Sequence, residues 1–191
     1  MVLLSLMQAA LAHAAQTSAT VVLLSTAAAP PPIVTPLHPT ALDDATIVAI
    51  FDAANTLDIK ASDLALNKSH NKDVRSLAKT FRHDHTAVRQ KGRDLAKKLG
   101  VTPTPPASFA LADQHAQAMK DLKSKSGAEF DRAYAAEEVK YHQDVIDALN
   151  TTLLPAIQNA ELKSFVQSVV PAFQGHLAAA KALQQKLGES S

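Results

Sequence analysis

The sequence predicts an all-α protein folded as a four-helix bundle, and three observations lead to this fold class. Hydrophobic residues make up 47% of the 191 residues and glycine only 5, with strings of Ala, Leu, Lys and Gln that favour helix. From Asp43 onward, apolar residues recur every three or four positions, which is the period of an amphipathic helix. No segment shows a competing strand pattern.

The composition argues against several classes of function. The formal net charge is +1, from 19 basic and 18 acidic residues, so the basic surface of a nucleic-acid-binding protein is absent. Aromatic residues make up 4% of the chain and Trp is missing, which argues against a base-stacking platform. Because the chain has no cysteine, disulfides, thiolate metal ligands and a cysteine nucleophile are excluded.

The first two long helices are predicted to be antiparallel neighbours. The first spans about residues 43–68 and begins at the acidic pair Asp43–Asp44, which suits a helix N-terminus. Its expected apolar stripe is Ile47, Ile50, Ala54, Leu57, Ala61 and Leu64. The second helix begins after Asn71, a good capping residue, and ends at Gly100. A connection of a few residues makes antiparallel packing the expectation.

A long crossover is predicted between the second and third long helices. Residues 101–106 contain three prolines and should form a stiff extended segment, and residues 108–124 should form a short helix. At 1.5 Å per residue this helix covers about 25 Å, most of the bundle's height. The crossover permits a ferritin-like topology, in which the second and third long helices run parallel. A simple up-down-up-down order stays open as the alternative.

The third and fourth long helices complete the predicted bundle domain, residues 41–191. The third spans about residues 128–153 and is ended by Pro155. The fourth is capped by Asn159 and continues to about Leu187. Pro171 lies inside the fourth helix, where we expect it to kink the helix or to split it.

Residues 1–40 are predicted to be a signal-like tail that is cleaved or disordered. Residues 2–11 have the length of a signal-peptide apolar region, and Ala12-His13-Ala14 is typical of a cleavage site. A second apolar run and several prolines follow, and neither run reaches the ~20 residues of a membrane span. No Lys or Arg precedes Lys60, so a loosely attached, uncleaved tail is the alternative to export. We expect export to the periplasm or cell envelope.

Three histidines lie on the apolar stripes of three different predicted helices, near the middle of each. They are His85, His142 and His176, and counting from the helix ends places them at one depth. Asp58 is near the middle of the first helix, while Glu138 lies one turn before His142 on the same face. Imidazole and carboxylate ligands on facing helices suit divalent metals. The five residues therefore predict a candidate site for one divalent ion: Zn, Cu, Fe or Mn.

The pattern of a di-iron bundle is absent, because that centre requires Glu-x-x-His on two helices. The residues three before the histidines are Arg82, Val139 and Phe173. Two interpretations stay open: a mononuclear metal site in a binding protein, or a metal-free network of buried histidines and carboxylates in a structural or partner-binding protein. A metal-dependent oxidoreductase would also need an open coordination position and a substrate channel.

Other polar residues are predicted to lie outside this layer. His83 should point away from the core, since it is two residues from His85 on the same helix, whereas His115 could face the bundle from the crossover helix. His13, His38 and His70 should be solvated. The charged run from Lys91 to Lys98 should form a solvated face, with peripheral contact to an anionic envelope surface as the alternative.

Several short segments, in order, resemble a bacterial family called domain of unknown function 4142. They are Leu57-Asp58-Ile59, Asp84-His85-Thr86, Leu99-Gly100-Val101 before a proline-rich break, residues 126–134, His142, and Pro171 followed by His176-Leu177. The resemblance covers roughly residues 44–187. It implies an exported protein with a ferritin-like helical bundle and no established activity. Asp58 replaces the family's usual Glu, which shortens a candidate ligand by one methylene.

Overall fold

The computed structural model describes residues 42–189, and all regular secondary structure in that range is helical. The predicted tail, residues 1–40, lies outside the described residues, as do Ser190 and Ser191. The helices are α1 (Asp44–Lys68), α2 (Lys72–Leu99), α3 (Ala110–Ser124), α4 (Gly127–Ala148), the π-helical turn η1 (Leu149–Leu153), the single turn α5 (Leu154–Ala156) and α6 (Ala160–Glu189).

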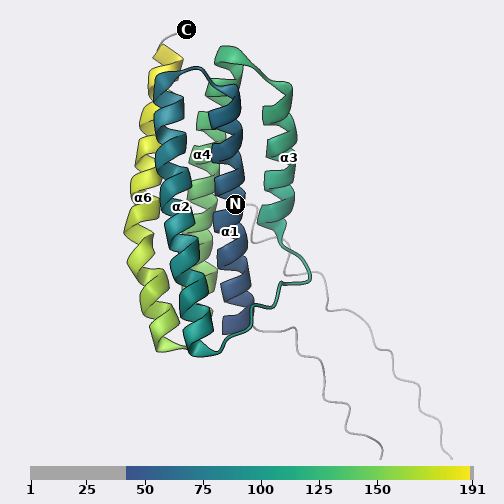
Figure 1. Ribbon diagram of the computed structural model, residues 1–191, viewed down its shortest axis with the longest axis vertical. Coiled ribbons are helices and arrows are strands. Elements are labelled where there is room, and N and C mark those ends of the chain that lie inside the picture. The colour runs from purple at the N-terminus through teal and green to yellow at the C-terminus, as the bar shows by residue number, and fades with distance from the viewer. Residues whose placement is uncertain (1–41, 190–191) are drawn as a thin grey trace, which may run out of the picture. The chain divides into compact units, whose positions relative to one another are not determined.

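Four long helices lie side by side, and each contacts two neighbours in the cyclic order α1, α2, α6, α4 (Figure 1). Following the colours along the chain, α2 and α4 run in one direction and α1 and α6 in the other (Figure 1). The crossover prediction is therefore confirmed, and a simple up-down-up-down order is excluded for the described residues. Helix α3 contacts α1 and α4 from outside the four-helix group.

The helix ends follow from the predicted capping residues. The Asp43 carboxylate accepts a hydrogen bond of 2.7 Å from the backbone N–H of Thr46. The Asn71 side chain accepts bonds from the first turn of α2, and Gly100 ends that helix with φ 68°. This left-handed conformation is readily adopted by glycine, which has no Cβ. These local interactions explain why the boundaries of α1 and α2 were predictable.

The structure decides two details of the predicted helices. Helix α6 continues through Pro171, so of the two expected effects, a kink or a split, the split does not occur. Buried residues on both sides, Val169 and Phe173, pack into the core and hold the helix together, while Pro171 itself is exposed. Helix α4 ends at Ala148 and not at Leu153, because residues 149–153 widen into a π-helical turn.

The buried stripe of α1 also differs from the prediction. Ile50, Ala54, Leu57 and Leu64 are only half-buried. Ile47 and Ala61 are buried as predicted, and the other buried central positions are Phe51, Asn55, Asp58, Ser62 and Ala65. Helix α1 contacts α3 as well as α2 and α4, so it carries apolar residues on more than one face. Spacing alone does not identify which stripe faces the centre.

The core is divided into two apolar clusters with a polar layer between them. One cluster includes Ile47, Phe51 and Phe173, near the start of α1. The other includes Val74 and Phe130, near the end of α1. Between them lie buried polar side chains from all four long helices: Asn55, Asp58, Ser62, His85, Glu138, His142 and His176.

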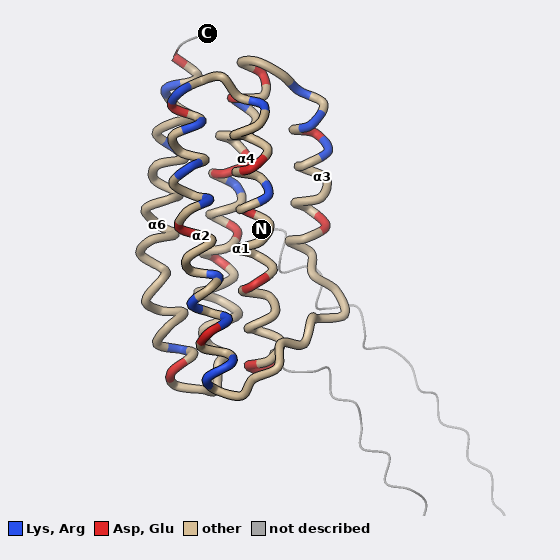
Figure 2. Tube along the Cα trace, in the orientation of Figure 1, with Lys and Arg blue, Asp and Glu red and all other residues tan. Residues whose placement is uncertain are grey.

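The surface agrees with the predicted charge pattern. Lys91, Arg93, Asp94, Lys97 and Lys98 are all exposed, and Figure 2 shows both signs of charge along α2. Among the described helices, none has the length and hydrophobicity needed to cross a membrane.

Replacing Pro171 with Ala should raise the free energy of unfolding by about 1 to 3 kcal/mol, because alanine restores a backbone N–H inside a continuous helix. Urea unfolding monitored by circular dichroism measures the change. Pro105→Ala, in the extended segment before α3, is the control and should give no gain. Equal or lower stability of the Pro171 variant would contradict the view that this proline strains α6.

Candidate metal centre

The structure brings all five predicted site residues to the polar layer, from four different helices. Asp58 comes from α1, His85 from α2, Glu138 and His142 from α4, and His176 from α6. All five are buried, and His176, at 7% exposure, is the most accessible of them.

Three ring nitrogens and one carboxylate oxygen converge at the middle of this layer. His85 Nε2 lies 3.4 Å from His142 Nε2 and 3.2 Å from His176 Nδ1. Asp58 Oδ2 lies 3.4 Å from His85 Nε2 and 3.6 Å from His142 Nε2. These four atoms, one from each long helix, are called the inner donor set below.

Each histidine directs its other nitrogen outward to a hydrogen-bond acceptor. His85 Nδ1 lies 2.9 Å from Asn55 Oδ1, and His142 Nδ1 lies 3.0 Å from the backbone oxygen of Glu138. His176 Nε2 lies 3.1 Å from Asp84 Oδ2. The Asn55 amide is oriented by its own N–H donation to the Phe51 carbonyl, so its oxygen faces His85.

These outer contacts determine where the ring protons are. A carbonyl, an amide oxygen and a carboxylate can only accept, so each outer nitrogen must be the N–H donor. A neutral imidazole has a single N–H, which leaves all three inner nitrogens as bare lone pairs. Burial, with the nearby His142 and His176, lowers the pKa of His85 well below its usual value, and burial likewise lowers the pKa of His176. The neutral forms of His85 and His176 are therefore favoured.

Several buried oxygens of the layer lack a hydrogen-bond partner. Asp58 Oδ1 accepts a hydrogen bond of 3.4 Å from the Ser62 hydroxyl, but Asp58 Oδ2, both Glu138 oxygens and the Tyr134 hydroxyl have none. Glu138 Oε2 lies 3.5 Å from His142 Nδ1. Burial raises the pKa of Asp58 well above its usual value, with a further rise from the Glu138 charge. Burial raises the pKa of Glu138 to about 8. A proton on Asp58 could pair with only one of the three lone pairs, so the metal-free layer stays incompletely satisfied.

Aromatic rings fix the orientation of two histidines. Phe173 stacks on His85 with ring centroids 5.3 Å apart and planes 10° apart. Phe81 stacks on His176 at 4.4 Å and 29°, and also lies 4.8 Å from the His142 ring. These contacts limit rotation of the rings and keep the inner nitrogens directed at one another.

The remaining histidine predictions divide as follows. His83 is exposed, as expected. His115 is buried against Tyr141, with ring centroids 5.7 Å apart, and contributes nothing to the inner donor set.

The sequence analysis did not predict Asn55 as part of the polar layer. The available signal was an amide three residues before Asp58 on the same helix, which places both side chains on one face.

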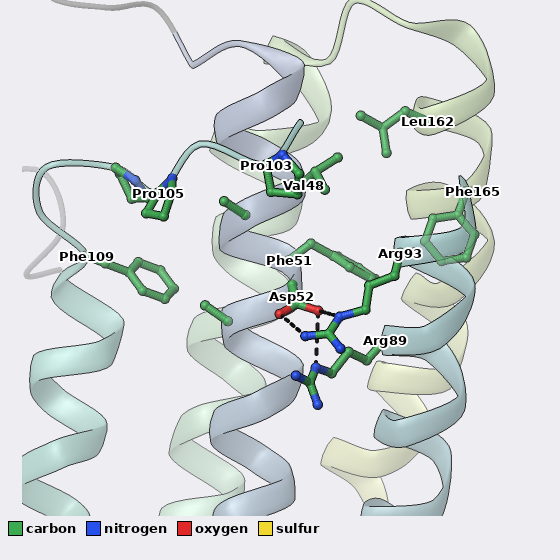
Figure 3. A pocket seen from close by; sticks show the side chains of 14 residues that line it. Val48, Phe51, Asp52, Arg89, Arg93, Pro103, Pro105, Phe109, Leu162 and Phe165 are labelled. Atoms are coloured by element: carbon green, nitrogen blue, oxygen red, sulfur yellow. Dashed lines mark hydrogen bonds and ion pairs between the residues drawn. The ribbon is translucent and has the colours of Figure 1, made fainter. Parts of the chain in front are cut away.

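A cavity of about 380 Å³ lies nearer the start of α1, lined by α1, α2, the segment before α3 and α6 (Figure 3). Its walls are mostly apolar and include the rings of Phe51 and Phe109. Its polar corner is Asp52, which accepts hydrogen bonds from Arg89 and Arg93 (Figure 3). None of the five site residues lines this cavity, so it gives no route from solvent to the inner donor set.

Comparison with known proteins supports the fold and identifies the family. A solved structure described as "CopM in the Cu(II)-bound form" matches with a TM-score of 0.58 and 14% sequence identity, covering 75% of this chain and 98% of that chain. At this identity the likeness shows the fold alone. No curated protein sequence matches the chain significantly. The family model for a domain of unknown function, DUF4142, matches residues 27–183, and the chain therefore belongs to the DUF4142 family.

Proposed function

We propose that this protein is an exported, ferritin-like bundle that binds one divalent transition-metal ion through His85, His142, His176 and Asp58. The observation that carries the proposal is the convergence of three bare imidazole lone pairs and one unpaired carboxylate oxygen. The imidazole lone pairs repel one another, and a proton on Asp58 can pair with only one of them. A cation would satisfy all four donors together, whereas a single proton would satisfy one.

Four of the six separations within the inner donor set fit a small ion. Donors placed about 2.0 to 2.1 Å from a tetrahedral ion lie about 3.4 Å from one another. The distances from His85 Nε2 to His142 Nε2 and His176 Nδ1, and from Asp58 Oδ2 to His85 Nε2 and His142 Nε2, are 3.4, 3.2, 3.4 and 3.6 Å. Asp58 makes no ion-pair contact with His176, so one of these two side chains would have to move for all four donors to reach one ion.

The donor types favour copper or zinc over iron or manganese. Three imidazoles and one carboxylate form a nitrogen-rich set, and imidazole suits copper and zinc, whereas manganese prefers oxygen. At one such site, affinity for divalent ions generally rises to a maximum at copper. The similar solved structure is titled as a Cu(II)-bound form, which agrees with copper as the first ion to test.

The charge of the buried carboxylates and the number of protein donors favour a metal-binding protein over a metal-dependent enzyme. A divalent ion would be neutralised by the carboxylates of Asp58 and Glu138, both of which are fully buried. The inner donor set already supplies four protein donors, which leaves no open position at a tetrahedral ion. An oxidoreductase, the less favoured alternative, would need one donor to leave. A metal-free structural or partner-binding role is the other alternative.

Location in the periplasm or cell envelope is part of the proposal. It is supported by the apolar segment of residues 2–11 and by Ala12-His13-Ala14, which is typical of a signal-peptide cleavage site.

Copper(II) or zinc(II) should raise the melting temperature of the metal-free protein by about 5 to 10 °C when present at about 100 times its dissociation constant. Elemental analysis of untagged protein should give up to one ion per chain. His85→Ala, His142→Ala and His176→Ala should each lose both effects. His83→Ala is the matched control, because His83 is exposed on α2, and it should behave as wild type.

Two results would contradict this prediction. Wild-type protein that holds no ion and melts identically with chelator or added metal would overturn the metal site and favour the metal-free network. A histidine variant that keeps one ion at full affinity would remove that residue from the ligand set.

Asn55→Leu should weaken metal affinity by about 10- to 100-fold, because His85 loses the acceptor that keeps its proton on Nδ1. Competition with a chromophoric chelator measures the dissociation constant. Asn67→Leu, an exposed position on the same helix, serves as the control and should leave affinity unchanged. Unchanged affinity in the Asn55 variant would mean that this hydrogen bond does not position His85.

Glu138→Gln should stabilise the metal-free protein at pH 9 by roughly 2 to 4 kcal/mol and have little effect at pH 5. Burial raises the pKa of Glu138 from 4.5 to about 8, so the folded state favours the neutral acid. Its stabilising contribution is present below pH 4.5 and is lost as pH rises through about 8. Urea unfolding at pH 5 and pH 9, with chelator present, measures the free energy of unfolding of both proteins. Glu129→Gln, exposed on α4, should show no such trend, and a pH-independent difference for Glu138→Gln would contradict the prediction.

A further inference from the structure

The metal centre is closest to solvent at one place, between α2 and α6. The side chains of Asp58, His85, His142 and Glu138 are at most 4% exposed. The His176 side chain is 9% exposed, and its partner Asp84 is 41% exposed. Within residues 42–189, Asp84 is therefore the carboxylate that is both accessible to solvent and in contact with a residue of the inner donor set.

A single ring connects this surface to the centre. His176 Nε2 lies 3.1 Å from Asp84 Oδ2 at the outer side, while its Nδ1 lies 3.2 Å from His85 Nε2 at the inner side. Asp84 does not belong to the inner donor set, so its charge is available to an incoming cation.

The other approaches that the structure describes are more obstructed. The two apolar clusters close the ends of the polar layer. Helix α3 covers α1 and α4, where His115 and Tyr141 are buried against each other. Beside His176, by contrast, a Cβ added to the exposed Gly175 would meet no atom within 4 Å. There is thus open space at Gly175, which precedes His176 on the exposed side of α6.

We propose that divalent cations enter between α2 and α6, that Asp84 captures the hydrated ion, and that His176 is the first residue of the centre to bind it. This inference rests on the proposed metal-binding function. A carboxylate oxygen of Asp84 replaces one water of the hydrated ion, and that water returns to solvent. His176 Nδ1 then replaces a second water, and the other three donors replace further waters.

The rate of metal uptake tests the entry route, whereas the dissociation constant tests the metal site itself. Stopped-flow mixing of metal-free protein with copper(II) or zinc(II), at low ion concentration, gives the second-order rate constant. Asp84→Asn should lower that rate constant about three- to tenfold at low ionic strength, and the difference should shrink at about 1 M salt. The dissociation constant should change less than about threefold, because the Asn oxygen still accepts from His176 Nε2.

Two further variants test the role of the Asp84 charge. Asp84→Glu keeps the charge and should restore most of the rate. Asp94→Asn removes an equal, exposed charge from the same helix and should leave the rate unchanged. Wild-type uptake by Asp84→Asn, or equal slowing by both Asn variants, would overturn the route while leaving the metal site intact. Absence of metal binding by wild type would overturn the proposed function and the route together.

Discussion

The position of one proton on each of three buried imidazole rings determines what the middle of the bundle can hold. His85, His142 and His176 each direct an N–H to a group that can only accept: an amide oxygen, a backbone carbonyl and a carboxylate. The opposite nitrogens are thereby left as lone pairs, and Asp58 adds another acceptor. Hydrogen-bond acceptors cannot satisfy one another, so the layer favours a group that accepts electron pairs, such as a metal cation. The outer hydrogen bonds of the three histidines set this preference in the metal-free protein.

The two apolar clusters explain how the fold can keep such a layer. Unpaired buried polar groups are destabilising, each by about 1 to 3 kcal/mol, so the bundle must gain its stability elsewhere. Clusters around Phe51 and Phe130 provide apolar burial on both sides of the layer. Phe81 and Phe173, stacked on the histidines, extend that packing to the layer itself. The candidate ligands are thus held by side chains that do not depend on metal for their own burial.

The sequence predicts the parts of this arrangement that depend on local signals. Asn71 and Gly100 define the ends of α2 by capping, and counting from such ends places His85, His142 and His176 at one depth. The sequence analysis did not predict Asn55 as a buried residue, because the stripe of α1 that contains it is partly polar and a more apolar stripe lies beside it. The choice between them depends on which helices surround α1, and that is tertiary information. The π-helical turn after Ala148 likewise has no local signature that fixes it.

The three histidines are not equivalent, and the difference explains why the centre lies close to one face. His85 and His142 use Nε2, the nitrogen farther from the backbone, whereas His176 uses Nδ1, the nearer one. The centre therefore lies nearer to the backbone of α6 than to those of α2 and α4. With Nδ1 turned inward, the far nitrogen of His176 extends toward α2, where it contacts Asp84. Because His176 turns Nδ1 inward, its Nε2 contacts Asp84, whose side chain is 41% exposed, and this ring joins the buried donors to the surface.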